Sequence, residues 1–275
     1  MKKKRILILL VLIILLLCAA AFDNRLAVRS YAVDAEEITS PVRIALVTDL
    51  HSCSYGEGQA ELIEAVDGLE PDIVLLGGDI FDDVLPDTNT ELFIAGISGK
   101  YPCYYVTGNH EHWSGEAAFV VKMDILKKHG VHILSGTCET LSINGQSINI
   151  CGVDDPDAHA GNKQEAFLAQ LDEVKRLSDN GHYTILLSHR PEYFGAYAEQ
   201  GFDLVLSGHA HGGQWRIPLI LNGLYAPDQG WFPEHAGGKY VQGETTMIVS
   251  RGLARESTRI PRIFNRPELV CIELS

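Results

Sequence analysis

Short apolar runs recur along this 275-residue chain, and amphipathic stretches separate them. This alternation limits the possible folds more than any other feature. The runs are apolar on successive residues and rich in β-branched side chains, which is typical of strands covered on both faces. The intervening stretches repeat apolar residues at helical spacing. The pattern predicts an α/β layered domain. The predicted strands are Val42–Thr48, Ile73–Leu76, Tyr104–Thr107, Ile148–Val153, Thr184–Ser188, Leu204–Ser207, Thr246–Ser250 and Leu269–Leu274, and the predicted helices are Gln59–Leu69, Glu116–His129 and Lys163–Leu177.

Aspartate, asparagine and histidine follow five of these strands directly. In open α/β sheets, ligands collect beyond the carboxyl ends of the strands, so we expect these side chains at one rim. Their donors are oxygen and nitrogen, which suit Mn²⁺, Fe or Zn²⁺ better than Ca²⁺ or Cu(I). Seven donors exceed the needs of one ion, and an aspartate can bridge two ions. The seven residues are Asp49, His51, Asp79, Asn109, His189, His209 and His211.

The local spacing supports a common site. In an extended chain, residues i and i+2 point the same way, so Asp49 and His51 can face one point, as can His209 and His211. A glycine precedes Asp79, Asn109 and His209, and glycine allows the backbone to turn sharply as a strand ends.

With its five motif blocks in this order, the chain resembles the calcineurin-like metallophosphoesterase superfamily over residues 42 to 274. The blocks are Asp49-Leu50-His51, Gly78-Asp79-Ile80-Phe81-Asp82, Gly108-Asn109-His110-Glu111, His189 and Gly208-His209-Ala210-His211. The apolar N-terminus and the segments Ser250–Leu253 and Pro261–Glu268 resemble the bacterial YkuE/YaeI-like branch. The resemblance implies a four-layer αββα sandwich, in which two mixed β-sheets are flanked by helices and the metals lie at one edge.

The resemblance also implies a role for each motif residue. Asp49, His51 and His211 would hold one divalent ion, and Asn109, His189 and His209 a second, with Asp79 bridging both. Mn²⁺ is the favoured metal. His110 would stabilise the transition state or protonate the leaving oxygen, and Asp82 would orient its ring. Two such ions can turn a shared water into hydroxide and hold the phosphoryl oxygens during in-line attack.

Other residues near the motifs have competing interpretations. Arg251 is the preferred candidate for holding a non-reacting phosphate, whereas Arg190 could equally form a surface salt bridge. Trp231 either faces the substrate or anchors a long loop. Asp83, beside Asp82, is read as a turn residue. An exported domain permits a disulfide, but Cys103, Cys151 and Cys271 lie in predicted strands and are read as buried apolar residues.

The N-terminus predicts export of the domain. Four cations in residues 1–5 precede an unbroken apolar run over residues 6–22, and flanking cations stay on the cytoplasmic side. The run is longer than a usual signal-peptide core, which favours an uncleaved transmembrane signal-anchor over a signal peptide cleaved after Ala19–Ala21. Residues 23–40 are predicted to be a linker, and residues 41–275 are predicted to be the catalytic domain. The protein is expected in the cell membrane as a single-pass protein with this domain outside the cytoplasm. Residues 214–244 read as a long functional loop.

The charge balance bears on partners. Four of the 22 basic residues precede the apolar run, which leaves 18 basic against 36 acidic residues outside. This excess of acid disfavours nucleic acid as a partner. The expected function is hydrolysis of a phosphodiester or pyrophosphate. The alternatives are a metal-dependent nuclease and a non-catalytic metal-binding envelope scaffold. The predicted anchor and the aromatic residues of the long loop favour a lipid-linked substrate at the membrane surface.

Overall fold

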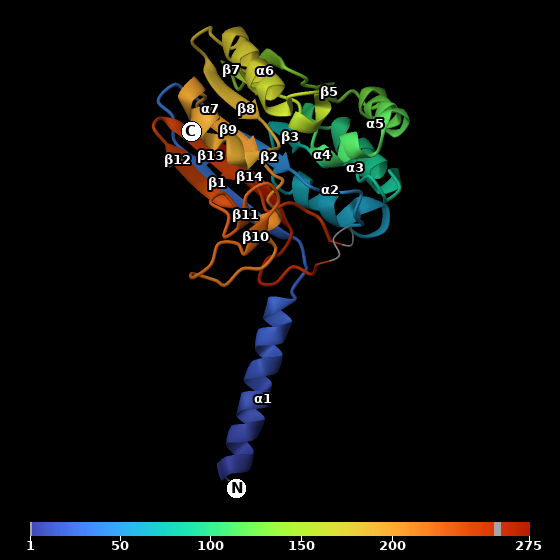
Figure 1. Cartoon of the computed structure of the whole chain (residues 1–275), viewed down its shortest axis with the longest axis vertical. Helices are drawn as coiled ribbons and strands as arrows, with labels where there is room; N and C mark the ends of the chain where they lie inside the picture. The colour runs from blue at the N-terminus through green and yellow to red at the C-terminus, as the bar shows by residue number, and fades with distance from the viewer. Residues whose placement is uncertain (1, 256–259) are drawn as a thin grey trace.

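Two six-stranded mixed sheets pack face to face in the computed structural model, which describes residues 2–255 and 260–275 (Figure 1). The first sheet has the order β1-β14-β2-β3-β4-β5, and only the β14–β2 pair is antiparallel. The second has the order β12-β13-β9-β8-β7-β6, and its two outermost pairs are antiparallel. The strands are β1 (Ala27–Val33), β2 (Val42–Val47), β3 (Ile73–Gly77), β4 (Cys103–Val106), β5 (His132–Ile133), β6 (Thr137–Ile143), β7 (Gln146–Gly152), β8 (Tyr183–Leu187), β9 (Leu204–Ser207), β12 (Gly238–Gln242), β13 (Thr245–Val249) and β14 (Glu268–Leu274).

Helices cover the outer face of each sheet. The helices α2, α3 and α5 lie against the first sheet, and α6 and α7 lie against the second. The four layers that the resemblance implied are therefore confirmed. The helices are α1 (Lys2–Ala21), α2 (Ala60–Asp67), α3 (Thr88–Ser98), α4 (Asn109–Trp113), α5 (Glu116–Lys128), α6 (Lys163–Leu177) and α7 (Phe194–Gln200).

The central strands are apolar on successive residues because both of their faces are buried. On β2, Ile44 and Leu46 pack between the sheets, whereas Ala45 and Val47 pack beneath the helices of the first sheet. Successive side chains of a strand point to opposite faces, so one run serves two cores. This double burial holds the carboxyl ends of the central strands in fixed positions.

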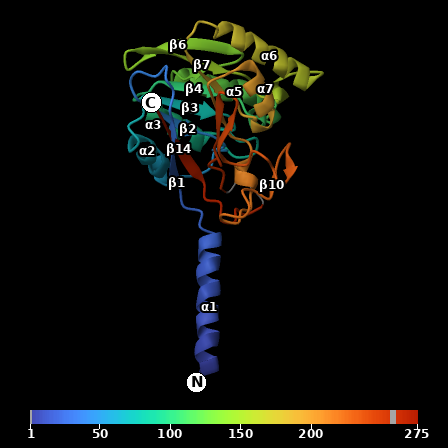
Figure 2. The ribbon, with the colours of Figure 1, turned by 90° about the vertical axis from the view of Figure 1, so that its left-hand side faces the viewer.

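The helix α1 extends away from the sheets (Figures 1 and 2). Residues 3–21 include an 18-residue window with a mean hydropathy of 2.7, and no residue of that window is buried by the rest of the chain. Its length and composition are those of a membrane-spanning helix, and a signal sequence has the same properties.

Two predictions about irregular segments are wrong. Residues 27–33 of the predicted 23–40 linker form β1, which pairs in parallel with β14, and residues 238–242 of the predicted loop form β12. Two further strands of that loop, β10 (Tyr225–Ala226) and β11 (Gly230–Trp231), form a small hairpin. Both β1 and β12 are edge strands with mostly exposed or half-buried side chains, so they lack a continuous apolar run.

Cys151 is buried, as predicted, but it is not a free cysteine. Cys151 forms a disulfide with Cys138, which lies directly opposite it on the antiparallel neighbour β6. The strand β6 is half exposed and was not predicted, so the sequence did not indicate that the two cysteines are neighbours. Cys103 and Cys271 are free and buried, as expected.

Candidate metal centre

The carboxyl ends of β2, β3, β4, β8 and β9 meet at one rim of the two sheets. The residues that follow these strands supply aspartate and histidine side chains whose donor atoms lie within 4.8 Å of one another in overlapping groups. Two of these groups contain predicted ligands alone: Asp49, His51 and His211 in one, and Asp79, His189 and His209 in the other.

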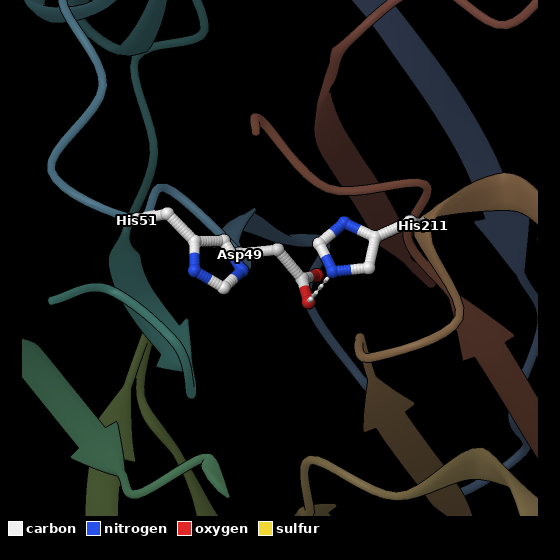
Figure 3. A group of neighbouring side chains, drawn as sticks. All are labelled: Asp49, His51 and His211. Atoms are coloured by element: carbon white, nitrogen blue, oxygen red, sulfur yellow. Dashed lines mark ion pairs between the residues drawn. The ribbon is translucent and has the colours of Figure 1, made fainter. Parts of the chain in front are cut away.

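The first group takes residues from both sheets. In Figure 3, the Asp49 carboxylate lies between the imidazole rings of His51 and His211. The His211 Nε2 atom is 3.8 Å from Asp49 Oδ1, and the centroids of the two rings are 5.2 Å apart. This geometry leaves a carboxylate oxygen and two ring nitrogens facing a shared space.

Asp79 joins the two groups. Its Oδ2 atom lies 3.5 Å from His51 Nε2 and 3.2 Å from His189 Nε2. The Nδ1 atom of His189 lies 2.9 Å from the carbonyl oxygen of Gly77. A ring N–H donated to that carbonyl leaves Nε2 of His189 available as a ligand atom.

The site contains several buried side-chain oxygen and nitrogen atoms that have no hydrogen-bond partner among the described residues. Buried polar atoms normally form hydrogen bonds, so a cluster of exceptions requires an explanation. Within residues 2–255 and 260–275, six of the seven predicted ligands have such an atom: Asp49 Oδ2, His51 Nε2, Asp79 Oδ2, Asn109 Oδ1, His189 Nε2 and His211 Nδ1. All are oxygen or nitrogen donors, and the set fits divalent transition-metal ions.

His209 has a different environment. Its Nε2 atom lies 2.9 Å from Asp228 Oδ2 and 3.0 Å from a guanidinium nitrogen of Arg190. Asp228 comes from the irregular segment after β9 and forms a further acidic group with His209 and Glu192. No motif indicated Asp228, because its approach to the rim depends on the path of that segment.

The charged groups of the site and their burial strongly shift one another's pKa values. Burial alone would raise the pKa of Asp79, but the neighbouring His189 lowers it well below its usual value. Burial alone would lower the pKa of His189, and the Asp79 carboxylate instead raises it to about 10. Burial, and then the positive charge of His51, lower the pKa of His211 well below its ordinary value. Asp79 is therefore held as an anion in the interior, which is the state that a bridging ligand requires.

The backbone adopts unusual conformations at the ligands. Asp49, His51, Asp79, His209 and His211 all have φ between 47° and 64°, in the left-handed region. Non-glycine residues there cost of order 1–3 kcal/mol each and persist where the surroundings enforce them. Such strain concentrates at functional sites.

The glycines before the ligands serve two purposes. Gly78 has φ +89°, as predicted for a sharp turn, and a Cβ atom there would lie 2.6 Å from His189 Nδ1. Gly108 and Gly208 lack a positive φ and are required for space alone. A Cβ atom would lie 2.2 Å from Asp79 Oδ1 at Gly108 and 2.5 Å from Asp49 Oδ2 at Gly208. The two carboxylates thus fit against bare backbone.

Glu111 is a functional residue to which sequence reasoning gave no role, although it stands in the third motif. It is fully buried, and its carboxylate accepts the backbone N–H groups of Asp79, Phe81 and Gly108 at 3.1, 3.0 and 2.8 Å. Burial and the nearby Asp79 raise the pKa of Glu111 to about 7. Glu111 ties the turn after β3 to the turn after β4, and so it positions Asp79 and Asn109 relative to each other.

Asp82, predicted to orient the His110 ring, lies within ion-pair distance of His110 but nearer to His51. Asp82 Oδ2 lies 3.1 Å from His51 Nδ1 and 3.9 Å from His110 Nδ1. Asp83 Oδ1 instead lies 2.6 Å from His110 Nδ1. Asp82 and Asp83 are neighbours in one turn, and the directions of their side chains decide which histidine each one contacts. Their position in the sequence could not predict this.

Each of the two candidate phosphate-binding arginines is paired with a buried carboxylate. Arg251 Nε lies 3.2 Å from the buried carboxylate of Glu268, and the pocket that Arg251 lines contains none of the seven ligands. Arg190 is buried rather than on the surface, and its guanidinium forms two hydrogen bonds to Asp155. Its contact with His209 makes Arg190 a support for a ligand.

Trp231 is 68% exposed and lines an apolar pocket of about 330 Å³ with Trp215, Leu224 and Tyr225. The backbone N–H of Leu224 donates to the carbonyl of Gly213, which lies two residues after His211. The apolar pocket therefore begins beside the metal centre.

Comparisons with known proteins give the following similarities. Residues 42–213 match the family described as calcineurin-like phosphoesterase. An uncharacterized metallophosphoesterase of Aquifex aeolicus is 30% identical over 90% of this chain and 92% of its own. The phosphodiesterase YaeI of Escherichia coli is 26% identical over 86% of this chain and 83% of its own. The NAD nucleotidase structure from Haemophilus influenzae shares the fold, with a TM-score of 0.53 and 16% identity over 78% of this chain and 46% of that chain. Against the Helicobacter pylori metallophosphoesterases, 29% identical over 69% of this chain, the chain spans only 50% of the relative's length.

Proposed function

Because the chain belongs to the calcineurin-like phosphoesterase family, we propose that it is a dinuclear metal-dependent phosphoesterase that hydrolyses a phosphodiester or pyrophosphate bond. The position of Asp79 Oδ2, 3.5 Å from His51 Nε2 and 3.2 Å from His189 Nε2, is the observation that supports this most. One buried oxygen that faces the donors of both groups is what two neighbouring ions require.

The six other donors would divide into two sets of three around Asp79. Asp49, His51 and His211 would hold one ion, and Asn109, His189 and His209 the other, with Mn²⁺ favoured. The bound ions would supply Lewis acidity, which activates water at neutral pH and stabilises charge on the phosphoryl oxygens. Asp228, beside His209, would bring further negative charge to the second set.

His110 is proposed to donate a proton to the leaving oxygen. The His110 ring is partly exposed and lies edge-on to His51, with ring centroids 4.3 Å apart, so it borders the metal centre. The contact of Nδ1 with Asp83 leaves Nε2 as the ring nitrogen that would face the substrate. The backbone N–H of His110 donates to Asp79 Oδ1 at 2.9 Å, which fixes the residue relative to the bridging carboxylate.

We further propose that α1 is an uncleaved membrane anchor and that the catalytic domain lies outside the cytoplasm. The cations before the apolar run support this orientation. The substrate is proposed to be lipid-linked, because the apolar pocket around Trp231 adjoins the rim and contains large apolar side chains that remain solvent-exposed. Its phosphate would reach the metal centre while its apolar part occupies that pocket.

Turnover of bis(p-nitrophenyl) phosphate by the full chain in detergent tests the catalytic proposal. We expect activity with added Mn²⁺, loss of activity with a chelator, and recovery when Mn²⁺ is restored. Metal analysis of protein purified without chelators should give nearly two ions per chain. Saturation at one tightly bound ion would contradict the bridging role of Asp79.

The substrate proposal requires a paired comparison. We expect a lipid-linked pyrophosphate to be hydrolysed with a higher kcat/KM than its water-soluble head-group analogue in the same micelles. Trp231→Ala should reduce kcat/KM for the lipid-linked compound more than for the analogue, because truncation removes apolar contact area. Equal rates on both compounds, unchanged by Trp231→Ala, would refute a lipid substrate and leave the phosphoesterase proposal intact.

A further inference from the structure

A pocket lined by polar and apolar residues lies apart from both the metal centre and the apolar pocket around Trp231. It has a volume of about 510 Å³, and its lining includes Arg29, Arg216 and Arg251, the apolar loop Ile217–Leu221, and Phe264. None of the seven metal ligands lines it. The arginines come from β1, from the segment after β9 and from the end of β13, so the tertiary fold alone brings them together.

Positive charge in this pocket exceeds negative charge. The buried Glu268 serves two of the arginines, at 3.7 Å from Arg29 and 3.2 Å from Arg251. The Arg216 guanidinium donates to the Gly212 carbonyl and the Asn222 side chain. Within residues 2–255 and 260–275, no carboxylate lies within 4.0 Å of Arg216.

The environment of Arg216 favours an additional anion. Burial, followed by the charge of Arg251, lowers the pKa of Arg216 to about 10, so the guanidinium is still charged at neutral pH. An anion in the pocket would offset the repulsion between these two arginines. Arginine binds phosphate oxygens in a bidentate manner, which makes phosphate the best-matched anionic group.

Strongly exposed apolar side chains lie beside the charge. Leu219 and Ile220, at the tip of the loop, are 108% and 82% exposed. A ligand that satisfies both features carries a phosphate next to hydrocarbon. Phospholipids have this construction, whereas free phosphate satisfies only the arginines.

The pocket also lies at the end of the domain from which α1 leaves. The backbone N–H of Phe264, a lining residue, donates to the carbonyl of Ala21, the last residue of α1, at 2.8 Å. Figures 1 and 2 both place the segment after β9 at this end. A bilayer crossed by α1 would therefore meet the loop and the arginines at its surface.

We propose that Arg29, Arg216 and Arg251 bind the phosphate of an anionic membrane phospholipid whose acyl chains lie along Leu219 and Ile220. The proposal rests on the membrane anchoring proposed above and is independent of the phosphoesterase reaction. The bound lipid would fix the height and tilt of the domain over the bilayer, and so hold the neighbouring apolar pocket and metal centre against the membrane surface.

Energy transfer from tryptophan to a pyrene-labelled acyl chain measures this binding. The full chain in neutral detergent micelles is titrated with pyrene-acyl phosphatidylglycerol and, in parallel, with the matched phosphatidylcholine. Trp215 lies next to Arg216 and supplies a local donor. We expect phosphatidylglycerol to bind about tenfold more tightly than phosphatidylcholine, in keeping with one charge-assisted contact.

Two charge-removing variants and one control locate the site. Arg216→Gln and Arg29→Gln should each reduce the preference to about twofold or less, since each removes a phosphate-binding charge. Arg29 lies on an exposed edge strand, so that variant keeps the test valid if Arg216→Gln does not fold. The control Arg176→Gln, on the exposed face of α6, should retain the wild-type preference.

Two results would overturn the proposal. One is an equal affinity of the wild type for the two lipids, or an unchanged preference in both Arg216→Gln and Arg29→Gln. The other is complete displacement of the labelled lipid by millimolar glycerol 3-phosphate, which would assign the pocket to soluble phosphate esters. Hydrolysis of bis(p-nitrophenyl) phosphate by the same preparations tests the catalytic proposal separately, because lipid binding requires no turnover.

Discussion

The metal rim and the segment from Trp215 to Phe232 are neighbours in space but are built in opposite ways. At the rim, polar donor atoms are buried, the backbone is left-handed at five ligands, and glycines admit the carboxylates. In the Trp215–Phe232 segment, apolar side chains such as Leu219, Trp231 and Phe232 are exposed, and the only strands are the two-residue β10 and β11, which form a hairpin. The rim therefore buries polar ligand atoms, whereas the segment leaves large apolar side chains exposed to solvent.

This contrast separates two tasks. Catalysis requires donors held in one geometry, which the ends of doubly buried strands provide. Recognition of a lipid requires an apolar surface with an amphipathic border, which a loop can supply without disturbing the sheets. Substitutions at the rim should therefore change metal binding, rate and stability. Substitutions of the exposed apolar side chains in the segment should change mainly the choice of substrate and membrane contact, whereas Asp228 of the segment contacts the ligand His209 and belongs with the rim.

Asp79→Asn should have the largest effect. The amide cannot supply the anionic oxygen that both groups share, so we expect kcat/KM to fall at least about 10⁴-fold, the scale on which a member of a catalytic unit acts. Metal analysis should show fewer than two ions per chain. Full metal content with near wild-type turnover would show that the rim does not depend on Asp79 for metal binding or rate, and so would contradict the difference proposed between rim and segment.

His110→Ala should affect the rate without affecting metal content. Loss of a general acid costs about 10²- to 10⁴-fold, and His110 is not among the proposed ligands. The measurement pairs steady-state kinetics with metal analysis. Loss of an ion from this variant would show that His110 acts as a ligand.

Asp82→Asn and Asp83→Asn should separate two supporting roles. Asp82 contacts the ligand His51, so Asp82→Asn should weaken metal affinity about 10- to 100-fold, as loss of a partner of a ligating histidine does. Asp83 contacts His110, so Asp83→Asn should lower kcat at saturating metal and leave metal affinity close to wild type. Metal titrations of activity distinguish the two, and the reverse assignment would restore the sequence-based prediction for Asp82.

Gly252→Ala should destabilise the fold from the rim. Gly252 has φ +70°, and a Cβ atom there would lie 2.5 Å from Asp49 Cβ. We expect the free energy of unfolding to fall by about 2 kcal/mol, from backbone strain and steric displacement of Asp49. Chemical denaturation in detergent measures this, and an unchanged midpoint would show that the rim can relax around the added methyl group.

Leu219→Ser should have the smallest effect on stability and is the matched substitution in the segment. Leu219 is fully exposed, so the free energy of unfolding should change by no more than about 0.5 kcal/mol. The same denaturation measurement applies. A loss as large as that of Gly252→Ala would mean that the segment supports the core.

Much of the fold was readable because the central strands are buried on both faces. Continuous apolar runs predicted β2, β3, β4, β7, β8, β9, β13 and β14 to within two residues. The edge strands β1, β6 and β12 escaped prediction because half-exposed strands carry mixed side chains. The short helices α4 and α7 are too brief to show a helical period.

The sequence by itself determined the fold class, the family and a set of donor residues, because these follow from local runs and from what directly ends them. Only the tertiary structure decided partners: Asp82 with His51, Asp83 with His110, Cys138 with Cys151, and Glu111 with three backbone N–H groups. It also placed Arg251 with Arg29 and Arg216 in one pocket that none of the seven ligands lines. Such contacts depend on the direction of individual side chains and on how segments far apart in the sequence approach one another. Neither produces a repeating pattern of residues in the sequence.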